Sequence, residues 1–405
     1  MEKFIAIKVG KGDAFYLENM GNKILVDGGA SRRKFPQQFS DATDCMNVDI
    51  IICTHGDEDH VNGLIGYFEK KYKCREVWLP GSWLSRLDDM RKRPAEFIDE
   101  LINNINDLDD EFIMKNANSL EAIGDIIAQE QGKYKGGEND CDDFLSLALP
   151  YKNKYPNDKT EPLKKLSNRN FIARAILSLN DSPENNKLSP VLHMRRKIFD
   201  EKREKIFNST INAAGKILKL ASLAYDSGAT IRWFEYSKST ACGGVKYLQP
   251  VNSIEIFQAK RRAAFEYLCL TKANVESLVF YSCNEDGTAG VLLCADSNFL
   301  FQQSLAFLKC CKNLIVTAPH HGAEANSGVY QKLKLFINDN TIFVRSDTAQ
   351  SSTKANPRPC KAYKNLQHSR FCTICFAKTL KQDVVLHYNA NSGWLPYETN
   401  SCVCS

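Results

Sequence analysis

Thr54-His55-Gly56-Asp57-Glu58-Asp59-His60 is the stretch of sequence that decides the expected fold. It follows a continuous apolar run at 48–53, which is typical of a strand buried on both faces, and it opens a stretch with helical spacing that extends to about Lys71. A loop between a strand and a helix directs its side chains into the crevice at the carboxyl end of a sheet, where α/β proteins usually bind ligands. We therefore expect the side chains of this loop to form part of a site.

The residue types in this loop indicate a metal site. Four side chains that can bind metal, those of His55, Asp57, Asp59 and His60, fall within six residues, and such ligands suit zinc, manganese or iron. Acidic residues also favour the first turn of a helix, so an ordinary helix start would explain Asp57, Glu58 and Asp59. It would not explain two histidines in the same loop, and we favour the metal site.

Four further short motifs occur in a fixed order with this loop. They are Gly10-Lys11-Gly12-Asp13-Ala14, Ile24-Leu25-Val26-Asp27-Gly28-Gly29, Val291-Leu292-Leu293-Cys294-Ala295-Asp296 and Ala318-Pro319-His320-His321-Gly322. Together the five segments resemble the metallo-β-lactamase fold family, with Asp57 where the commoner loop signature, HxHxDH, has its second histidine. This variant is similar to the hydrolase domain of the ComEC competence proteins and their stand-alone relatives.

The resemblance covers roughly residues 1 to 83 and 270 to 390. It implies a four-layer αββα sandwich with a metal centre at one edge of the two sheets. It also implies one or two divalent metal ions, zinc or manganese, as cofactors. Carried over residue by residue, it assigns His55, Asp57 and His320 to one metal and Asp59 and His60 to a second, with Asp296 bridging the two.

The resemblance implies further roles for three residues. Asp59 would orient the attacking hydroxide as well as bind metal. His321 would either replace His320 as a ligand or contact the substrate as a catalytic residue, because the sequence does not separate two adjacent histidines. Asp27 would lie behind the metal ligands and hydrogen-bond to their loop, although an aspartate before two glycines is also an ordinary turn.

The sequence departs from the family at one ligand. The common pattern has another histidine between the loop and the bridging aspartate, and His193 is the only histidine there. We interpret His193 as a surface or helix-end residue. The first metal is therefore expected to be undercoordinated or absent, with water in the gap.

These inferences lead to a metal-dependent hydrolase that uses a metal-activated hydroxide. The Asp57 carboxylate is a harder ligand than imidazole, which favours manganese or another oxygen-binding ion. We expect a phosphodiesterase or nuclease that acts on nucleic acid or a nucleotide. The alternatives are hydrolysis of an ester, lactone or amide by the same hydroxide, and a catalytically silent binding or scaffold subunit, which the missing ligand would favour.

The motifs lie in two segments that are separated by a long helical stretch. Residues 1–83 and 229–405 show strand patterns, and we expect them to form one α/β hydrolase domain. Residues 84–228 are polar and mostly helical in pattern, so we expect a helical insertion. One hypothesis is that it covers and regulates the site, with a regulatory protein or a protease as its partner. A helix is also expected over Phe299 to Cys311.

The composition of the 405-residue chain is that of an ordinary globular protein. Its 53 basic and 48 acidic side chains give a net charge of +5, which permits a polyanionic substrate without requiring one. No apolar run approaches the roughly 18 to 20 residues of a membrane span, and the first residues lack the pattern of a secretion signal. We therefore expect a cytoplasmic protein without a membrane partner, whose 15 cysteines are reduced.

Two groups of residues stand apart from these inferences. Basic clusters at 91–93, 195–197, 202–203 and 260–262 could guide a phosphate backbone, but interleaved acidic residues favour a solvated helix face. Cys372 and Cys375, with Cys360, Cys402 and Cys404, hint at a zinc clip. Because the period of a strand places Cys372 and Cys375 on opposite faces, we favour the absence of a structural zinc.

Overall fold

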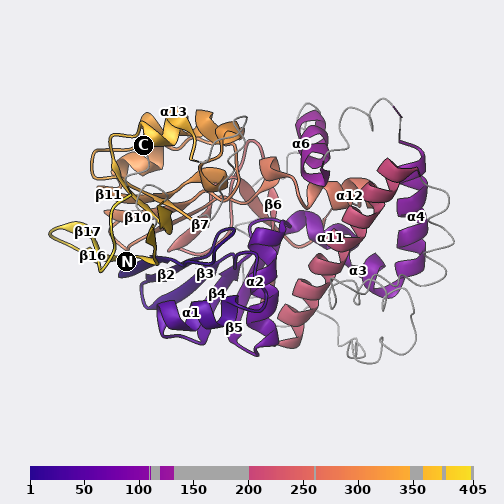
Figure 1. Ribbon diagram of the computed structural model, residues 1–405, viewed down its shortest axis with the longest axis horizontal. Coiled ribbons are helices and arrows are strands. Elements are labelled where there is room, and N and C mark those ends of the chain that lie inside the picture. Colours follow the sequence, from indigo (N-terminus) through magenta and orange to yellow (C-terminus); the bar gives the residue numbers. More distant parts are fainter. Residues whose placement is uncertain are drawn as a thin grey trace.

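The computed structural model describes residues 1–108, 110, 119–131, 200–259, 261–346, 359–375 and 380–402. Within these ranges two large β-sheets pack face to face, and helices cover the outer face of each (Figure 1). The molecule thus has the helix, sheet, sheet, helix layering of an αββα sandwich. The predicted α/β fold class is confirmed.

The described strands form two main sheets and one small one. The first sheet has the strand order β17-β16-β1-β2-β3-β4-β5-β6-β8, the second has the order β13-β12-β11-β10-β9-β7, and β14 pairs with β15. The first sheet consists of β1 (Lys3–Ala6), β2 (Phe15–Asn19), β3 (Asn22–Val26), β4 (Asn47–Ile52), β5 (Lys73–Pro80), β6 (Thr230–Tyr236), β8 (Ser253–Ile256), β16 (Val384–Asn389) and β17 (Gly393–Pro396). The others are β7 (Leu248–Pro250), β9 (Phe280–Cys283), β10 (Ala289–Leu293), β11 (Asn313–Thr317), β12 (Ile342–Arg345), β13 (Ser369–Cys372), β14 (Ile374–Cys375) and β15 (Leu380–Lys381).

Helices flank both sheets. The α-helices are α1 (Phe35–Thr43), α2 (Glu58–Glu69), α3 (Leu84–Lys92), α4 (Pro94–Asn106), α6 (Leu120–Gln131), α11 (Glu201–Asp226), α12 (Ala264–Leu270), α13 (Ser327–Lys334) and α14 (Lys361–Lys364). Short 3₁₀ turns are η1 (Gly81–Trp83), η2 (Asn274–Glu276), η3 (Ala306–Cys310), η4 (Pro319–Gly322) and η5 (Glu324–Asn326). Within the described part of the chain, none of the helices combines the length and the apolar character that a membrane crossing requires.

The space between the two sheets is filled by apolar side chains. Phe4, Phe15 and Trp78 project from the first sheet and belong to one buried cluster with Phe280 and Ile315 of the second. Each of the five is at most 2% exposed. Apolar surface removed from water stabilises a fold by about 25 cal/mol per Å², so this layer fixes how the two sheets face each other.

The direction of the strands determines where a site can form. Strands β3 to β6 are parallel to one another, and so are β10 to β13. Loops at the carboxyl ends of parallel strands lie along the same edge of a sheet. The segments that follow β3, β4, β10, β11 and β12 carry Asp27, residues 54–60, Asp296, residues 318–322 and Ser346, respectively, and residues 58–60 already belong to the first turn of α2.

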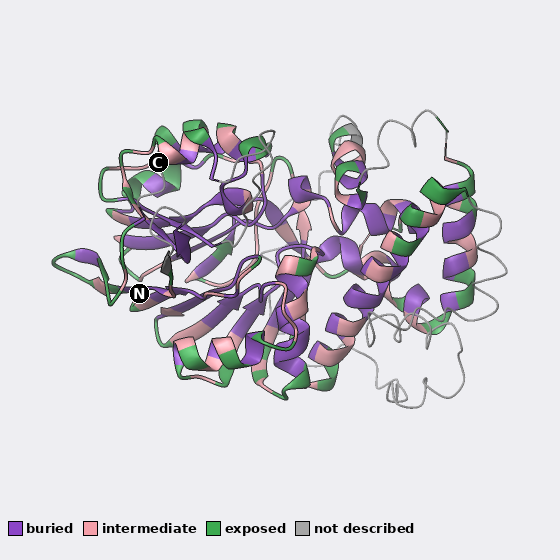
Figure 2. Ribbon diagram, in the orientation of Figure 1, coloured by how far each residue is buried: buried purple, intermediate pink, exposed green. Residues whose placement is uncertain are grey.

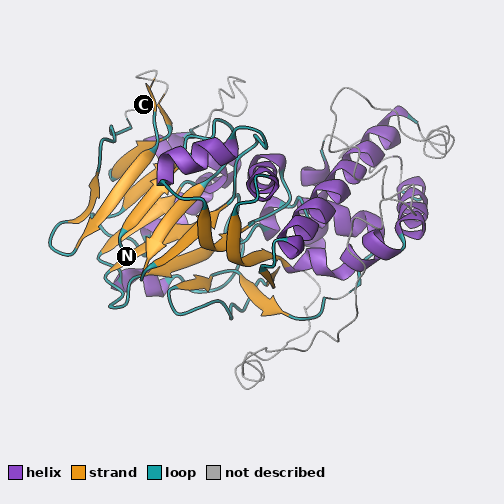
Figure 3. Ribbon diagram, turned by 90° about the horizontal axis from the view of Figure 1, so that it is seen from below, coloured by secondary structure: helices purple, strands orange, loops and turns teal. Residues whose placement is uncertain are grey.

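The helices α3, α4, α6 and α11 come between β5 and β6 in the chain, although these two strands are direct neighbours in the first sheet. They gather at one side of the sandwich, next to α12 (Figures 1 and 3). One buried apolar cluster extends from Leu64 of α2 to Phe97 and Leu101 of α4 and to Ile206 and Leu220 of α11. The buried faces of these helices point toward one another (Figure 2). The domain boundaries at residues 84 and 228 stay predictions.

The prediction of a helix over Phe299 to Cys311 is wrong. Only the short turn η3 is helical there, and Phe299 has a left-handed backbone with φ of 56°. Phe299, Phe301 and Leu305 are buried in the apolar cluster on the outer face of the second sheet. The Lys332 ammonium donates to the carbonyls of Phe299 and Phe301 at 2.9 and 2.8 Å, so tertiary contacts replace the hydrogen bonds that a helix would supply.

Candidate metal centre

The loop between β4 and α2 delivers its side chains to the edge of the first sheet. Helix α2 begins at Glu58 with Asp57 as its N-cap, which is typical because acidic residues favour a helix N-terminus. Gly56 donates its N–H to the Thr271 carbonyl at 2.7 Å, which holds the loop against the end of α12. His55 and His60 are 2% and 0% exposed, so both imidazoles point inward.

The Asp296 carboxylate lies at the middle of a ring of four imidazoles. Its Oδ2 atom is 3.7 Å from Nε2 of His55 and 3.5 Å from Nε2 of His320. Its Oδ1 atom is 3.4 Å from Nε2 of His60 and 3.9 Å from Nε2 of His321. The two adjacent histidines of the 318–322 loop therefore approach different oxygens of the same carboxylate.

The carboxylates of Asp57 and Asp59 also lie beside different histidines. Asp57 Oδ2 lies 3.9 Å from Nε2 of His55, and Asp59 Oδ2 lies 3.7 Å from Nε2 of His321. We call the two groups half-site 1 and half-site 2, and they share Asp296. Half-site 1 consists of His55, Asp57 and His320 at Oδ2 of Asp296, and half-site 2 consists of Asp59, His60 and His321 at Oδ1.

Each imidazole is oriented by a contact at its other ring nitrogen. Such contacts fix the ring and leave Nε2 for the centre, as is usual for histidines that bind metals. The partners of Nδ1 are Thr54 Oγ1 for His55 at 3.0 Å, Asp27 Oδ2 for His60 at 2.8 Å, Asn326 Oδ1 for His320 at 3.2 Å, and Asp13 Oδ1 and the Ser346 carbonyl for His321, both at 3.0 Å.

Asp27 connects the turn after β3 to the ligand loop. Its Oδ1 accepts the Thr54 N–H at 2.9 Å, and its Oδ2 accepts from the Thr54 hydroxyl at 2.7 Å as well as from His60. Asp27 thus lies behind residues 54–60 and is hydrogen-bonded to them. Its backbone is left-handed, with φ of 57°, which is uncommon for a residue other than glycine.

The 318–322 loop is strained in a way that separates its two histidines. His320 and His321 both have left-handed backbones, with φ of 46° and 55°, and Ala295 beside Asp296 has φ of 47°. Such conformations cost of order 1–3 kcal/mol each and collect at functional sites. Here they accompany the approach of consecutive side chains to opposite sides of Asp296.

Buried atoms without hydrogen bonds show that these residues fit a metal centre. His55 Nε2, His60 Nε2 and Asp296 Oδ1 are buried and find no hydrogen-bond partner among the described residues, only ion-pair contacts at 3.4–3.9 Å, and leaving such atoms unsatisfied is costly. Ligand atoms that share an ion at about 2.1 Å lie roughly 3.0–3.5 Å apart, close to the separations seen here. One ligand atom each from Asp13, His60, Asp296 and His321 lies within 4.8 Å of the others, which again suits a divalent ion.

The charges at the centre depend strongly on one another. Burial raises the pKa of Asp296, but His320, His60 and His321 outweigh burial and hold that pKa well below its ordinary value. Burial lowers the pKa of His60, and the carboxylates of Asp296 and Asp27 reverse this and raise it well above its ordinary value. A bound cation would take over the role of the protonated imidazole, so metal uptake should release protons.

The structure adds residues that the sequence did not assign to the site. Asp13, 1% exposed, orients His321, and its place in the Gly10–Ala14 motif was the available signal. Asn274 donates to Glu121 Oε1 at 2.6 Å and contacts His320 Nδ1 at 3.5 Å. Burial and the carboxylates of Asp57 and Asp296 raise the pKa of Glu121 to about 7. No sequence signal pointed to Glu121, because it belongs to α6, far from the motifs in the chain.

The prediction of an undercoordinated or absent first metal stays a prediction. Because His320 and His321 lie at different half-sites, each half-site holds two imidazoles and one carboxylate in addition to the shared Asp296. The arrangement of these side chains therefore uses no histidine from the segment between the loop and Asp296. His193 lies outside the described residues.

Comparison with known proteins supports this assignment of the fold. A sequence model of the metallo-beta-lactamase superfamily matches residues 7–125, which include the ligand loop. No curated protein matches the chain. The matched superfamily indicates a metal-dependent hydrolase. The buried cluster of histidines and aspartates indicates that a divalent metal ion can bind.

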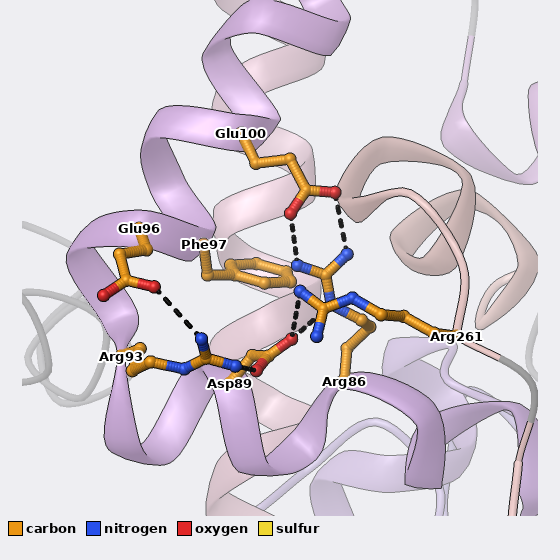
Figure 4. A pocket seen from close by; sticks show the side chains of 7 residues that line it. All are labelled: Arg86, Asp89, Arg93, Glu96, Phe97, Glu100 and Arg261. Atoms are coloured by element: carbon orange, nitrogen blue, oxygen red, sulfur yellow. Dashed lines mark hydrogen bonds and ion pairs between the residues drawn. The ribbon is translucent and has the colours of Figure 1, made fainter.

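A second, charged pocket lies between α3 and α4 (Figure 4). Arg86, only 1% exposed, pairs with both oxygens of Glu100 at 2.8 and 2.5 Å and with Asp89 at 2.8 Å. Arg93 and Arg261 also pair with Asp89. The basic side chains that line this pocket already have carboxylate partners in the chain, which favours a structural ion-pair network over a phosphate site.

Proposed function

We propose that the protein is a metal-dependent phosphodiesterase or nuclease, with nucleic acid or a nucleotide as its substrate. The observation that carries the proposal is the shared Asp296 carboxylate, with a half-site at each of its oxygens. Two divalent ions held there would lower the pKa of a water toward about 7 and offset charge on the attacking and leaving oxygens of a phosphoryl transfer. Zinc or manganese suits the mixture of imidazole and carboxylate ligands, and the Asp57 carboxylate favours manganese.

Each half-site has an ammonium group beside its carboxylate, which supports an anionic substrate. Lys272 Nζ lies 3.3 Å from Asp57 Oδ1, and Lys11 Nζ lies 3.8 Å from Asp59 Oδ2. The Lys11 side chain is 61% exposed and that of Lys272 is 20% exposed. Either ammonium group could turn from its carboxylate to a phosphate oxygen when ions neutralise the carboxylates. The Asp59 carboxylate would orient the attacking water.

The test is hydrolysis of a panel of substrates by the full-length protein with added manganese or zinc. We expect metal-dependent cleavage of DNA, RNA or a small phosphodiester, and little cleavage of neutral esters, lactones or β-lactams. Cleavage of the neutral esters, lactones or β-lactams without cleavage of the phosphodiesters would instead identify an ester, lactone or amide hydrolase. No cleavage of any member, with less than half an equivalent of bound metal, would replace it by a scaffold subunit.

Exchange of Lys272 for Met should separate substrate binding from metal binding. The change keeps most of the aliphatic side chain and removes the charge, so we expect KM for a phosphodiester to rise about tenfold, the equivalent of about 1.4 kcal/mol. Metal content should stay the same or increase, because the ammonium no longer competes for Asp57. Lys334→Met is the matched control, an exposed lysine on α13. Equal KM values in both variants would argue against Lys272 as a substrate contact.

We also propose that the segment between β5 and β6 covers the centre and regulates it through a protein partner or a protease. Two contacts of α6 support this. Glu121 accepts from Asn274, which contacts His320, and Asp125 Oδ1 accepts the Val275 N–H at 2.9 Å. Limited trypsin digestion should change the rate of hydrolysis several-fold as the segment is cut. A rate that stays constant while the segment is cleaved would exclude such regulation.

A further inference from the structure

Three cysteines from separate parts of the C-terminal region meet in one buried cluster. Cys372 ends β13, Cys375 ends β14, and Cys402 lies beyond β17. Their sulfur atoms all lie within 4.8 Å of one another. Cys372 and Cys375 are 0% exposed and Cys402 is 6% exposed, and the three form a cluster distinct from the large apolar ones.

A break in the strand explains why Cys372 and Cys375 turn to the same side. Strand β13 ends at Cys372, and the Thr373 N–H bonds to the Arg345 carbonyl at 3.0 Å. The next strand, β14, pairs with β15 in a separate small sheet, so the side-chain alternation of β13 does not continue through Cys375. The expectation of opposite faces, which rested on one unbroken strand, is wrong.

Backbone contacts bring the third cysteine to the other two. The Cys402 N–H donates to the Arg370 carbonyl at 2.7 Å, and Ser401 forms a β-bridge with Phe371. The Gln382 amide donates to the carbonyls of both Cys372 and Asn400, at 3.3 and 2.8 Å. The convergence is therefore part of the hydrogen-bonded structure.

We propose that Cys372, Cys375 and Cys402 bind a structural zinc ion that is separate from the candidate metal centre. Sulfur ligands about 2.3 Å from a tetrahedral zinc lie about 3.8 Å apart, which the separations here allow. A disulfide would use two of the sulfurs and leave the third in the same buried space, whereas one zinc ion uses all three. Ligands made only of sulfur select zinc over the harder ions expected at the aspartate-rich centre.

This zinc ion would fasten residues 401–402 to β13 and stabilise the strand edge that supports His321. Cys372 lies opposite Arg345 in the register of β12 and β13. The next residue, Ser346, accepts from His321 Nδ1 through its carbonyl and donates its hydroxyl to the Gly12 carbonyl at 2.8 Å. The strand partner of Cys372 is therefore the direct neighbour of Ser346, whose carbonyl orients His321 of half-site 2.

The test is cobalt substitution in the full-length protein under reducing conditions. Cobalt bound by thiolates gives an intense charge-transfer band in the near-ultraviolet, and the nitrogen and oxygen ligands of the candidate metal centre do not. In the wild-type protein we expect a band whose intensity corresponds to about one thiolate-bound cobalt per chain. We expect the band to be lost in both Cys375→Ser and Cys402→Ser. Cys310→Ser, which removes an exposed thiol outside the cluster, should keep the full band.

Zinc analysis and heat stability complete the test. X-ray absorption at the zinc edge should show three sulfur neighbours at about 2.3 Å, and removal of this zinc should lower the melting temperature. No thiolate band in the wild-type protein, or an equal band in the serine variants, would overturn the proposal. So would a disulfide between Cys372 and Cys375 that persists in reductant. Because the band requires sulfur, the result does not depend on whether the phosphodiesterase proposal holds.

Discussion

Replacing Asp296 by Asn should abolish metal-dependent hydrolysis and leave the protein folded. The amide has nearly the same shape, but it lacks the charge that faces four imidazoles at 3.4–3.9 Å. Removing a group that only supports a metal ligand costs about 10- to 100-fold in affinity or activity. The loss of a carboxylate shared by both half-sites should lower kcat/KM further, by about a thousandfold or more. The measurements are kcat/KM, metal content and circular dichroism on the same preparation.

The control for this variant is Asp339→Asn, a change of the same kind at an exposed position. It should match the wild-type protein in metal content and rate. If Asp296→Asn kept two equivalents of metal and a rate within tenfold of wild type, Asp296 would not be the shared ligand. The division into two half-sites would then be wrong.

Replacing Gly63 by Ala should destabilise the fold and the metal centre together. An alanine Cβ at this position in α2 would lie 1.8 Å from the Gly28 carbonyl oxygen, where no atom fits, so the backbone must move. The Gly63 N–H also donates to the Gly29 carbonyl at 2.9 Å. Overpacking lowers the free energy of unfolding by about 1–3 kcal/mol, and we expect a clash between two backbones to cost at least the upper value. This cost should exceed the gain of about 0.5–1 kcal/mol that alanine has over glycine in a helix.

The free energy of unfolding from denaturant titration measures the effect, and metal affinity should fall with it. The first turn of α2 carries Asp59 and His60, so displacement of the helix displaces ligands of half-site 2. Gly328→Ala is the matched control, because a Cβ there meets nothing within 4 Å and the residue lies in α13. Its stability should be unchanged or increased. Equal stability of the two variants would contradict the close packing of α2 on the turn after β3.

Much of the fold could be predicted because short segments carry strong local signals. The apolar run before Thr54 marked β4, and the helical spacing after it marked α2. Strand patterns were expected within residues 229–405, and β6 occupies Thr230–Tyr236 at the start of that range. The expected helix over Phe299 to Cys311 failed because its apolar residues are spaced to pack on the second sheet, with Lys332 holding the backbone carbonyls.

The candidate site was predictable as a set of residues, but its arrangement was not. The sequence brought His55, Asp59 and Asp296 together, and no linear pattern shows that consecutive histidines with left-handed backbones reach different oxygens of one carboxylate. The contact of Glu121 with Asn274 depends on the packing of α6 against η2. The convergence of the three cysteines depends on the break after Cys372. These are consequences of tertiary structure.

The most direct test of the two half-sites is the anomalous scattering of crystals grown with manganese or zinc. We predict two ions, one at each oxygen of Asp296, with His55, Asp57 and His320 around the first and Asp59, His60 and His321 around the second. A single ion bound by both His320 and His321, or no ion near Asp296, would contradict it.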